Sequence, residues 1–307
     1  MNTGYQVVSK ISEIELLPKE RYQHMFNYFK NKGRYAHNMM KGTAALHINL
    51  DYCNEEDFRK KIRTAYFLSP LVYYFFDNSP FFEGAVNYNA SIRSIIWDNC
   101  DNDRCGYVQN LFKEDYSYSD YASYILNTPP IIVMKDDGLL FTGEKLNKDI
   151  FRDTVFNNEE IAHLLSMVFP DVRLKKYLEI RVGDSLPYPY NLSYAAFWKG
   201  LLYNEKNLDL LYMKALNYKR EDLDFIKNSI RKEGIKSECY GIPLKEFMYQ
   251  LIEMAENGLA EDEQKYLVSI KEMLEENSIP KMKTLSEYEK SGDLNSALAW
   301  CIPLRGV

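Results

Sequence analysis

The chain has 307 residues, 46% of them hydrophobic, and can bury a sizeable core in one large domain or in one domain with a helical appendage. A net charge of −6 argues against a nucleic-acid surface, and no apolar run approaches the ~20 residues of a membrane span. The N-terminus lacks a signal-peptide pattern, and an odd number of scattered cysteines favours reduced thiols. We therefore expect a cytoplasmic protein without a nucleic-acid or membrane partner.

The first elements are a helix and a strand. A helix is expected within residues 13–31, with its start near Pro18. In the stretch 45–51, polar and apolar side chains alternate with a period of two, which predicts a strand. The apolar members are Leu46, Ile48 and Leu50.

A long helix is expected over 55–76, where apolar side chains form one stripe. An Asn- and Gly-rich loop follows over 81–90. The stretch 91–97, which carries Arg93, is expected to be a short strand or a loop. Three further elements follow, namely a helix over 116–126, a strand over 129–135 and a turn at 136–138.

The second half begins with a capped helix over 158–167 and a strand over 175–184, where Leu178, Ile180 and Val182 alternate with polar residues. Beyond Asn191 the pattern is helical almost to the end. The expected helices are 194–203, 207–216, 220–232, 244–257 and 260–276, with breaks at Gly234, Gly241 and Gly258. Mixed strands and helices followed by a helical final third indicate the α+β class.

The two alternating strands carry polar side chains on one face. If they pair in an antiparallel sheet, His47, Asn49, Glu179 and Arg181 converge along a cleft. His47 and Glu179 are suitable ligands for a divalent ion that bridges phosphates, and Arg181 is placed to bind a phosphate oxygen. The residues alone also allow a plainer interpretation, in which His47 is a structural histidine and Glu179 and Arg181 pair with other charges.

Several motifs then match a known family. FPDVRLKKYLEIRVGD, followed by AAFWKGLLY, resembles the glutamate-cysteine ligases of the plant and proteobacterial type. The resemblance extends upstream, in order and at similar spacing, over about residues 5–205. The upstream motifs are PKERYQHM, MMKGTAALHINLDY, LSPLVYYFFDNSPFFEG, ASIRSIIWDNCDNDRCG and YASYILNTPP.

The resemblance implies a carboxylate-amine ligase fold like that of glutamine synthetase, in which helices back an antiparallel sheet that lines an ATP and magnesium cleft. Residues 1–205 would be the catalytic core, and 206–307 a helical region packed on it. The implied reaction joins glutamate to an amine such as cysteine through an acyl phosphate, as in glutathione biosynthesis. The implied cofactors are ATP and Mg²⁺.

The resemblance also implies roles for individual residues. Glu179 matches the family's metal-binding glutamate, Arg181 its phosphate contact, and His47 a metal-binding histidine of a bacterial branch. Arg93 resembles the arginine that binds the substrate's α-carboxylate. The remaining matched positions would form the substrate pocket or its surroundings: Asn78, Ser79, Thr43, Trp97 and Asp184. Lys41 would compensate in part for an arginine that the plant-type pattern has at the position of Gly42.

One departure from the family is large. Its members have an N-terminal section with a Gly-x-Glu-x-Glu strand that supplies metal ligands, and no such motif occurs in this sequence. A partner polypeptide could supply the missing strands. Three readings stay open: a ligase that is active alone or with a partner, a non-catalytic relative that binds an amino acid or nucleotide or regulates another chain, and a fragment.

Overall fold

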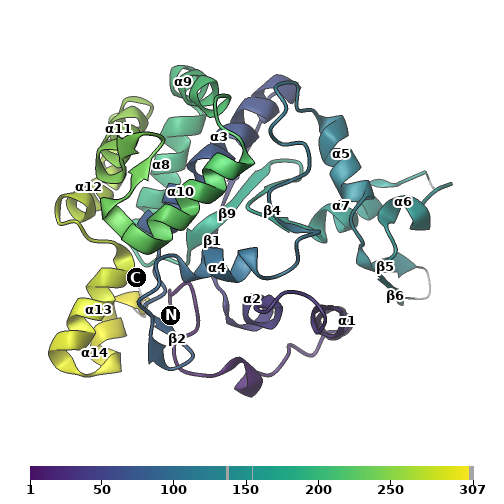
Figure 1. Cartoon of the computed structure of the whole chain (residues 1–307), viewed down its shortest axis with the longest axis horizontal. Coiled ribbons are helices and arrows are strands. Elements are labelled where there is room, and N and C mark those ends of the chain that lie inside the picture. The colour runs from purple at the N-terminus through teal and green to yellow at the C-terminus, as the bar shows by residue number, and fades with distance from the viewer. Residues whose placement is uncertain (136–137, 154, 304–307) are drawn as a thin grey trace.

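Helices surround a small antiparallel sheet in the computed structural model, which describes residues 1–135, 138–153 and 155–303 (Figure 1). The helices of the first half are α1 (Glu20–Phe29), α2 (Ala36–Gly42), α3 (Glu55–Phe75), α4 (Ile92–Asp98), α5 (Tyr118–Leu126), α6 (Asn147–Ile150) and α7 (Asn158–Ser166). Those of the second half are α8 (Tyr190–Leu202), α9 (Glu205–Ala215), α10 (Arg220–Glu233), α11 (Leu244–Asn257), α12 (Val268–Glu275), α13 (Pro280–Ser291) and α14 (Leu294–Leu298). Short 3₁₀ helices are η1 (Ile11–Glu13), η2 (Gly234–Lys236), η3 (Gln264–Leu267) and η4 (Ala299–Cys301).

The central sheet has the order β1 (Ala45–Leu50), β9 (Leu178–Asp184), β8 (Val172–Leu174), and both pairings are antiparallel. The other strands form two-stranded ribbons: β2 (Phe81–Phe82) with β3 (Ala85–Val86), β4 (Cys105–Gly106) with β7 (Phe169–Pro170), β5 (Ile131–Lys135) with β6 (Gly138–Gly143), and β10 (Glu238–Cys239) with β11 (Ile242–Pro243). The sheet itself is what positions the polar residues of the site.

The register of the sheet puts three polar positions in one row. Glu179 of β9 lies opposite Asn49 of β1 and opposite Arg173 of β8. Side chains opposite each other on neighbouring strands are close enough to interact. The β1–β9 register shifts between Leu46 and Ile48, so His47 sits at a β-bulge, a feature that re-aims a side chain.

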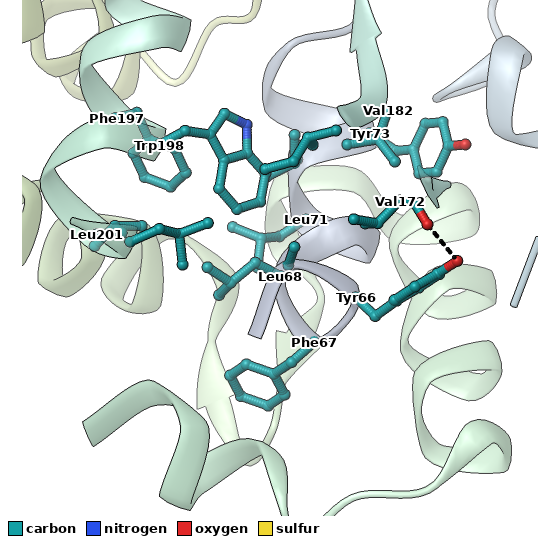
Figure 2. Close-up of a cluster of buried hydrophobic side chains, with 14 of the residues drawn as sticks. Tyr66, Phe67, Leu68, Leu71, Tyr73, Val172, Val182, Phe197, Trp198 and Leu201 are labelled. Carbon is teal, nitrogen blue, oxygen red and sulfur yellow. Dashed lines mark hydrogen bonds between the residues drawn. The ribbon is translucent and has the colours of Figure 1, made fainter. Parts of the chain in front are cut away.

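Helix α3 forms the centre of the core behind the sheet. Asn54 caps the start of α3 by accepting a hydrogen bond from the Asp57 amide, and the helix packs against β9, α9 and α10. Figure 2 shows Leu68 and Leu71 of α3 among Val182 of β9 and Trp198 of α8. The Tyr66 hydroxyl donates to the Val172 carbonyl at 3.2 Å, which ties α3 to β8 as well.

The C-terminal helices share this core. In α11, Phe247 lies 6.3 Å from Phe67 of α3 between ring centroids, and both belong to the largest hydrophobic cluster. The N-terminal segment contacts the last described helical turn, where the Asn2 amide donates to the Cys301 carbonyl at 2.7 Å. Among the described helices, none combines the length and apolar character needed to cross a membrane.

The mixed helix and strand content is confirmed, as are both predicted polar strands. The expectation of a strand or loop over 91–97 is wrong, because Ile92–Asp98 is helix α4, whose buried residues leave no clear amphipathic pattern. The expected loop at 81–90 contains the β2–β3 hairpin. The expected helix over 260–276 is shorter, since it begins as η3 and continues as α12. Residues 136 and 137 of the expected turn lie outside the described part.

Candidate active site

Glu179 is the centre of the candidate site. It is the second residue of β9 and is 5% exposed. Arg173, its neighbour on β8, donates to both carboxylate oxygens: Nε to Oε2 at 2.9 Å, and Nη2 to Oε2 at 2.7 Å and to Oε1 at 3.1 Å. This two-pronged geometry fixes the carboxylate in the plane of the guanidinium.

Three more basic side chains reach the same carboxylate. His47 Nδ1 lies 2.8 Å from Glu179 Oε1, Arg181 Nη1 lies 3.3 Å from Oε1, and Lys175 Nζ lies 3.1 Å from Oε2. We call Glu179, His47, Arg173, Lys175 and Arg181 the Glu179 cluster. The predicted convergence of His47, Glu179 and Arg181 is therefore confirmed as geometry, while their roles stay predictions.

The protonation states leave this cluster positively charged. Burial opposes ionisation of Glu179, but the His47 hydrogen bond and the charges of Arg173 and Arg181 outweigh it and hold the Glu179 pKa far below its ordinary value. Burial lowers the pKa of His47, despite the hydrogen bond to Glu179, so the imidazole is neutral at neutral pH and donates through Nδ1. Burial and Arg173 lower the pKa of Arg181 to about 10, which still leaves it charged.

Two arginines of the site have unused hydrogen-bonding capacity. The Nε atoms of Arg181 and Arg93 are buried and have no partner among the residues that the structure describes. The guanidinium of Arg181 also stacks 5.7 Å from the ring centre of Trp97. Buried donors are normally satisfied, so these nitrogens, beside an excess of positive charge, suit an anionic ligand.

A second group of predicted site residues gathers at the far end of β9. Arg93 of α4 donates through Nη1 to the Gly183 carbonyl at 2.7 Å and lies 3.3 Å from Asp184 Oδ1. Asp184 Oδ2 accepts from the Asn78 amide at 2.8 Å and from the Ser79 hydroxyl at 2.6 Å. We call Asp184, Arg93, Asn78 and Ser79 the Asp184 cluster.

The two clusters are linked through the β9 backbone, because Arg93 Nη2 also donates to the Arg181 carbonyl at 3.3 Å. Thr43 and Lys41 make other contacts. The Thr43 hydroxyl donates to the Met39 carbonyl at 2.7 Å, and Lys41 Nζ donates to the Ile11 carbonyl at 2.6 Å. Their predicted contacts with a substrate stay predictions.

The sequence analysis missed Arg173 and Lys175. A tight turn joins β8 to β9, with Leu174 opposite Leu178, and this register places Arg173 opposite Glu179. A hairpin with its turn at the two lysines would have predicted the contact, but β8 has only three residues, which are too few to establish an alternating pattern.

The donor set only partly suits a metal ion. In the described ranges, no three His, Cys, Asp or Glu residues gather in a way that could hold one. Glu179 is also shared among Arg173, Lys175 and Arg181, whereas Mg²⁺ prefers six oxygen ligands. The residues present do not make a magnesium site by themselves.

Comparisons with known proteins place these observations in context. The model for "Glutamate-cysteine ligase family 2 (GCS2)" matches residues 7–299. The chain is 29% identical over 301 residues to the chloroplastic glutamate–cysteine ligase B of Oryza sativa subsp. japonica, covering 94% of this chain and 60% of that protein. It is 30% identical over 300 residues to the chloroplastic glutamate–cysteine ligase of Nicotiana tabacum, covering 94% and 57%.

Two facts follow from these relatives. The chain spans about 60% of the length of the curated relatives it matches. Their names describe chloroplastic proteins, which contradicts the cytoplasmic location expected from the sequence. That expectation was wrong because a missing secretory signal does not distinguish the cytosol from an organelle.

Proposed function

The chain belongs to glutamate-cysteine ligase family 2, and on this premise we propose that it is an ATP-dependent carboxylate-amine ligase with the fold of that group. The reaction would join the γ-carboxylate of glutamate to the amine of cysteine or of another small amine. One observation carries the proposal, namely the surplus of positive charge in the Glu179 cluster together with the unpartnered Nε of Arg181. A triphosphate and a carboxylate repel each other, and such a cluster lowers that repulsion.

In the proposed first step, a γ-carboxylate oxygen of glutamate attacks the terminal phosphorus of ATP, and ADP leaves. The amine then attacks the acyl carbon, phosphate leaves and the nitrogen loses a proton. Arg181 would bind the transferred phosphoryl group, while Glu179 holds Arg173 and Arg181 in place. Arg93, Asn78 and Ser79 would bind the glutamate backbone, with Trp97, Thr43 and Lys41 around the pocket.

Magnesium is the metal that the family implies. The resemblance implies His47 and Glu179 as its ligands, but the Nδ1 of His47 lies 2.8 Å from Glu179 Oε1, so the Nε2 lone pair of the neutral imidazole points away from the carboxylate and the two side chains cannot hold one ion in this arrangement. A metal supplies charge neutralisation for phosphoryl transfer. We derive no step through it, because two shared donors do not complete its coordination.

A second candidate function is a binding or regulatory relative that acts with a partner polypeptide. Strand β1 lies at an edge of the central sheet as far as the structure describes it, and its apolar Leu46 and Ile48 are only half-buried. An unpaired edge accepts a further strand. An acidic strand would suit this edge, because it lies beside the positively charged Glu179 cluster.

The test is ATP turnover by the purified chain with Mg²⁺, glutamate and a series of amines, with ADP release and product mass read together. We expect ADP release that requires both glutamate and an amine, and a γ-glutamyl product. The variant Arg181→Gln tests the role of Arg181 in this turnover. Its control is Arg152→Gln, because Arg152 is exposed and lies outside both clusters. ADP release without an amide product would contradict the ligase proposal, and no turnover at all would favour the partner-dependent function.

A further inference from the structure

Four charged residues from four separate elements meet in the interior. Asp77 follows α3, Asp184 ends β9, Arg93 lies in α4 and Lys281 in the first turn of α13. Their exposed fractions are 1%, 3%, 2% and 2%. Two carboxylates and two cations thus balance in a place that water hardly reaches. We call these four residues the buried quartet.

Lys281 contacts both ends of one segment of the chain. Its amide donates to the Asp77 carbonyl at 3.0 Å, and its Nζ lies 3.6 Å from Asp77 Oδ2. The same Nζ donates to the Asn89 carbonyl at 2.5 Å. One side chain of the C-terminal region therefore holds residues 77–89 closed. Pro280 at the first position of α13 fixes the helix start from which Lys281 projects.

Asp77 connects Lys281 to the candidate site through hydrogen bonds. Its Oδ1 accepts from the Ser79 amide at 3.0 Å, and its Oδ2 accepts from the Ser91 amide at 2.9 Å. Ser79 bonds Asp184, and Ser91 is the residue from which α4 starts, in a left-handed conformation with φ of 55°. Arg93 stands two positions into that helix. The Asp77 carboxylate thus sets the position of both the Asn78–Ser79 turn and Arg93.

Lys281 provides the second positive charge that balances the two buried carboxylates. Without it, two buried carboxylates would share the single guanidinium of Arg93, and a buried carboxylate without a counter-charge is strongly unfavourable. Burial already raises the pKa of Asp184, Arg93 opposes this rise, and the charge of Asp77 adds to it. Loss of Lys281 would favour protonation of one carboxylate and weaken the hydrogen bonds that it accepts.

We propose that Lys281 is a positioning residue of the candidate site, which acts through Asp77 on the segment 77–91 and on Arg93 without touching a substrate itself. Its importance for catalysis rests on the proposed function, whereas the positioning itself does not. The C-terminal region would then be more than a cover for the core. It would supply one of the charges that give the site its shape.

The test is amide hydrogen exchange of the whole chain, read by mass spectrometry. In Lys281→Met we expect exchange in 77–91 to rise at least about tenfold, with exchange in α5 and α7 unchanged. Lys290→Met is the matched control, because it removes the same charge from an exposed position of the same helix. Leu285→Ala loosens the packing of α13 from a position that is 6% exposed and is not part of the quartet.

A double-mutant cycle decides whether the effect passes through Asp77. If the two residues act through one contact, the double variant Asp77→Asn, Lys281→Met gains less than the two single variants together. The rise in exchange in 77–91 should be smaller than the product of the two single rises by a factor of at least about ten. Full additivity, or a Lys281→Met pattern equal to that of Leu285→Ala, would overturn the proposal. So would unchanged exchange in 77–91.

The kinetic readout separates this inference from the proposed function. If the chain is a ligase, Lys281→Met should raise KM for glutamate about tenfold and change kcat less than about threefold, because Arg93 is displaced while Arg181 is not. A chain without ligase activity that still shows the coupling in exchange would contradict the proposed function alone. A ligase without the coupling would contradict the positioning role alone.

Discussion

Strand β9 carries a buried carboxylate near each end, and the two behave in opposite ways. Glu179 is 5% exposed and Asp184 3% exposed, yet the pKa of Glu179 is held far below its ordinary value and that of Asp184 is raised to about 6. Burial acts on both in the same direction. Glu179 is surrounded by three cations and a histidine, whereas Asp184 has one close cation, Arg93, and a second carboxylate, Asp77, nearby.

The contrast separates a cluster with surplus positive charge from a set of buried charges that is balanced. The Glu179 cluster has more positive charge than its own carboxylate can neutralise, and it retains an unpartnered donor on Arg181. The buried quartet around Asp184 is balanced within the chain. A surplus of charge is stabilised when an anion binds, whereas a balanced set of buried charges is disrupted by the loss of any member.

The largest effect is therefore expected from Arg93→Met. It leaves Asp184 without its nearest cation and the Gly183 and Arg181 carbonyls without their donor. Removing one partner of a buried pair costs about 3–5 kcal/mol, so the free energy of unfolding in urea should fall by that amount. Arg152→Met, at an exposed position, is the control. A loss under about 1 kcal/mol would mean that the Asp184 end is not held by charge balance.

At the other end, Arg181→Gln should damage function more than stability. On the proposed function it removes a donor that would bind the transferred phosphoryl group, and such losses cost about 10²–10³ in kcat. The free energy of unfolding should fall by less than it does in Arg93→Met, because Arg173 and Lys175 still neutralise Glu179 after one cation of the surplus is removed. The two quantities are measured on one preparation, by ADP release and by urea unfolding. A variant that lost stability and activity in parallel would abolish the distinction between the two ends.

The pH dependence of stability tests the Asp184 end alone. Its carboxyl pKa is raised from 3.8 to about 6 on folding, so the folded state binds the proton more tightly than the unfolded chain does. Its contribution to stability is then greatest below the unfolded pKa and is lost as the pH rises from about 4 to about 6. A shift of this size corresponds to at most about 3 kcal/mol.

The contribution of Glu179 to the pH dependence of stability has the opposite sign. Its lowered pKa contributes stability above about pH 4.5, and this stability is lost as the pH falls. Comparison of the unchanged chain with Asp184→Asn isolates the contribution of Asp184 to the pH dependence of stability. The difference in the free energy of unfolding between the two proteins, measured from pH 4 to pH 7, should change between about pH 4 and pH 6 and level off above. A flat difference would show that Asp184 ionises normally.

The sequence predicted the Glu179 end far better than the Asp184 end. Alternation over 45–51 and 175–184 predicted that His47 and Glu179 share a face if the two strands pair, and the antiparallel pairing of β1 with β9 brings them together. The motifs predicted the family, which the match over residues 7–299 confirms. Site roles for Arg93, Asn78, Ser79, Thr43, Lys41 and Trp97 stay predictions.

The residues of the Asp184 end were named from the family motifs, but their contacts escaped prediction for physical reasons. Helix α4 is buried along most of its length, so Arg93 and its neighbours show no helical stripe. Lys281 comes from α13, a helix that the sequence analysis did not predict, and reaches Asp77 across about 200 residues of chain. A local sequence pattern cannot predict such a contact, because the contact depends on the tertiary packing of α13 beside the end of α3.

The smallest effect is expected from magnesium alone. Without a nucleotide, Mg²⁺ would have to compete with Arg173 for both oxygens of Glu179, in a cluster that already carries excess positive charge. A metal at about 1 mM that binds with a Kd of about 10 mM adds less than about 0.1 kcal/mol, so Tm should rise by less than about 1 °C. Arg173→Gln relieves that competition, and the same Mg²⁺ addition should then raise Tm more than in the unchanged chain. If Mg²⁺ alone raised Tm of the unchanged chain by several degrees, the Glu179 cluster would be a cation site, and the contrast between the two ends of β9 would have to be redrawn.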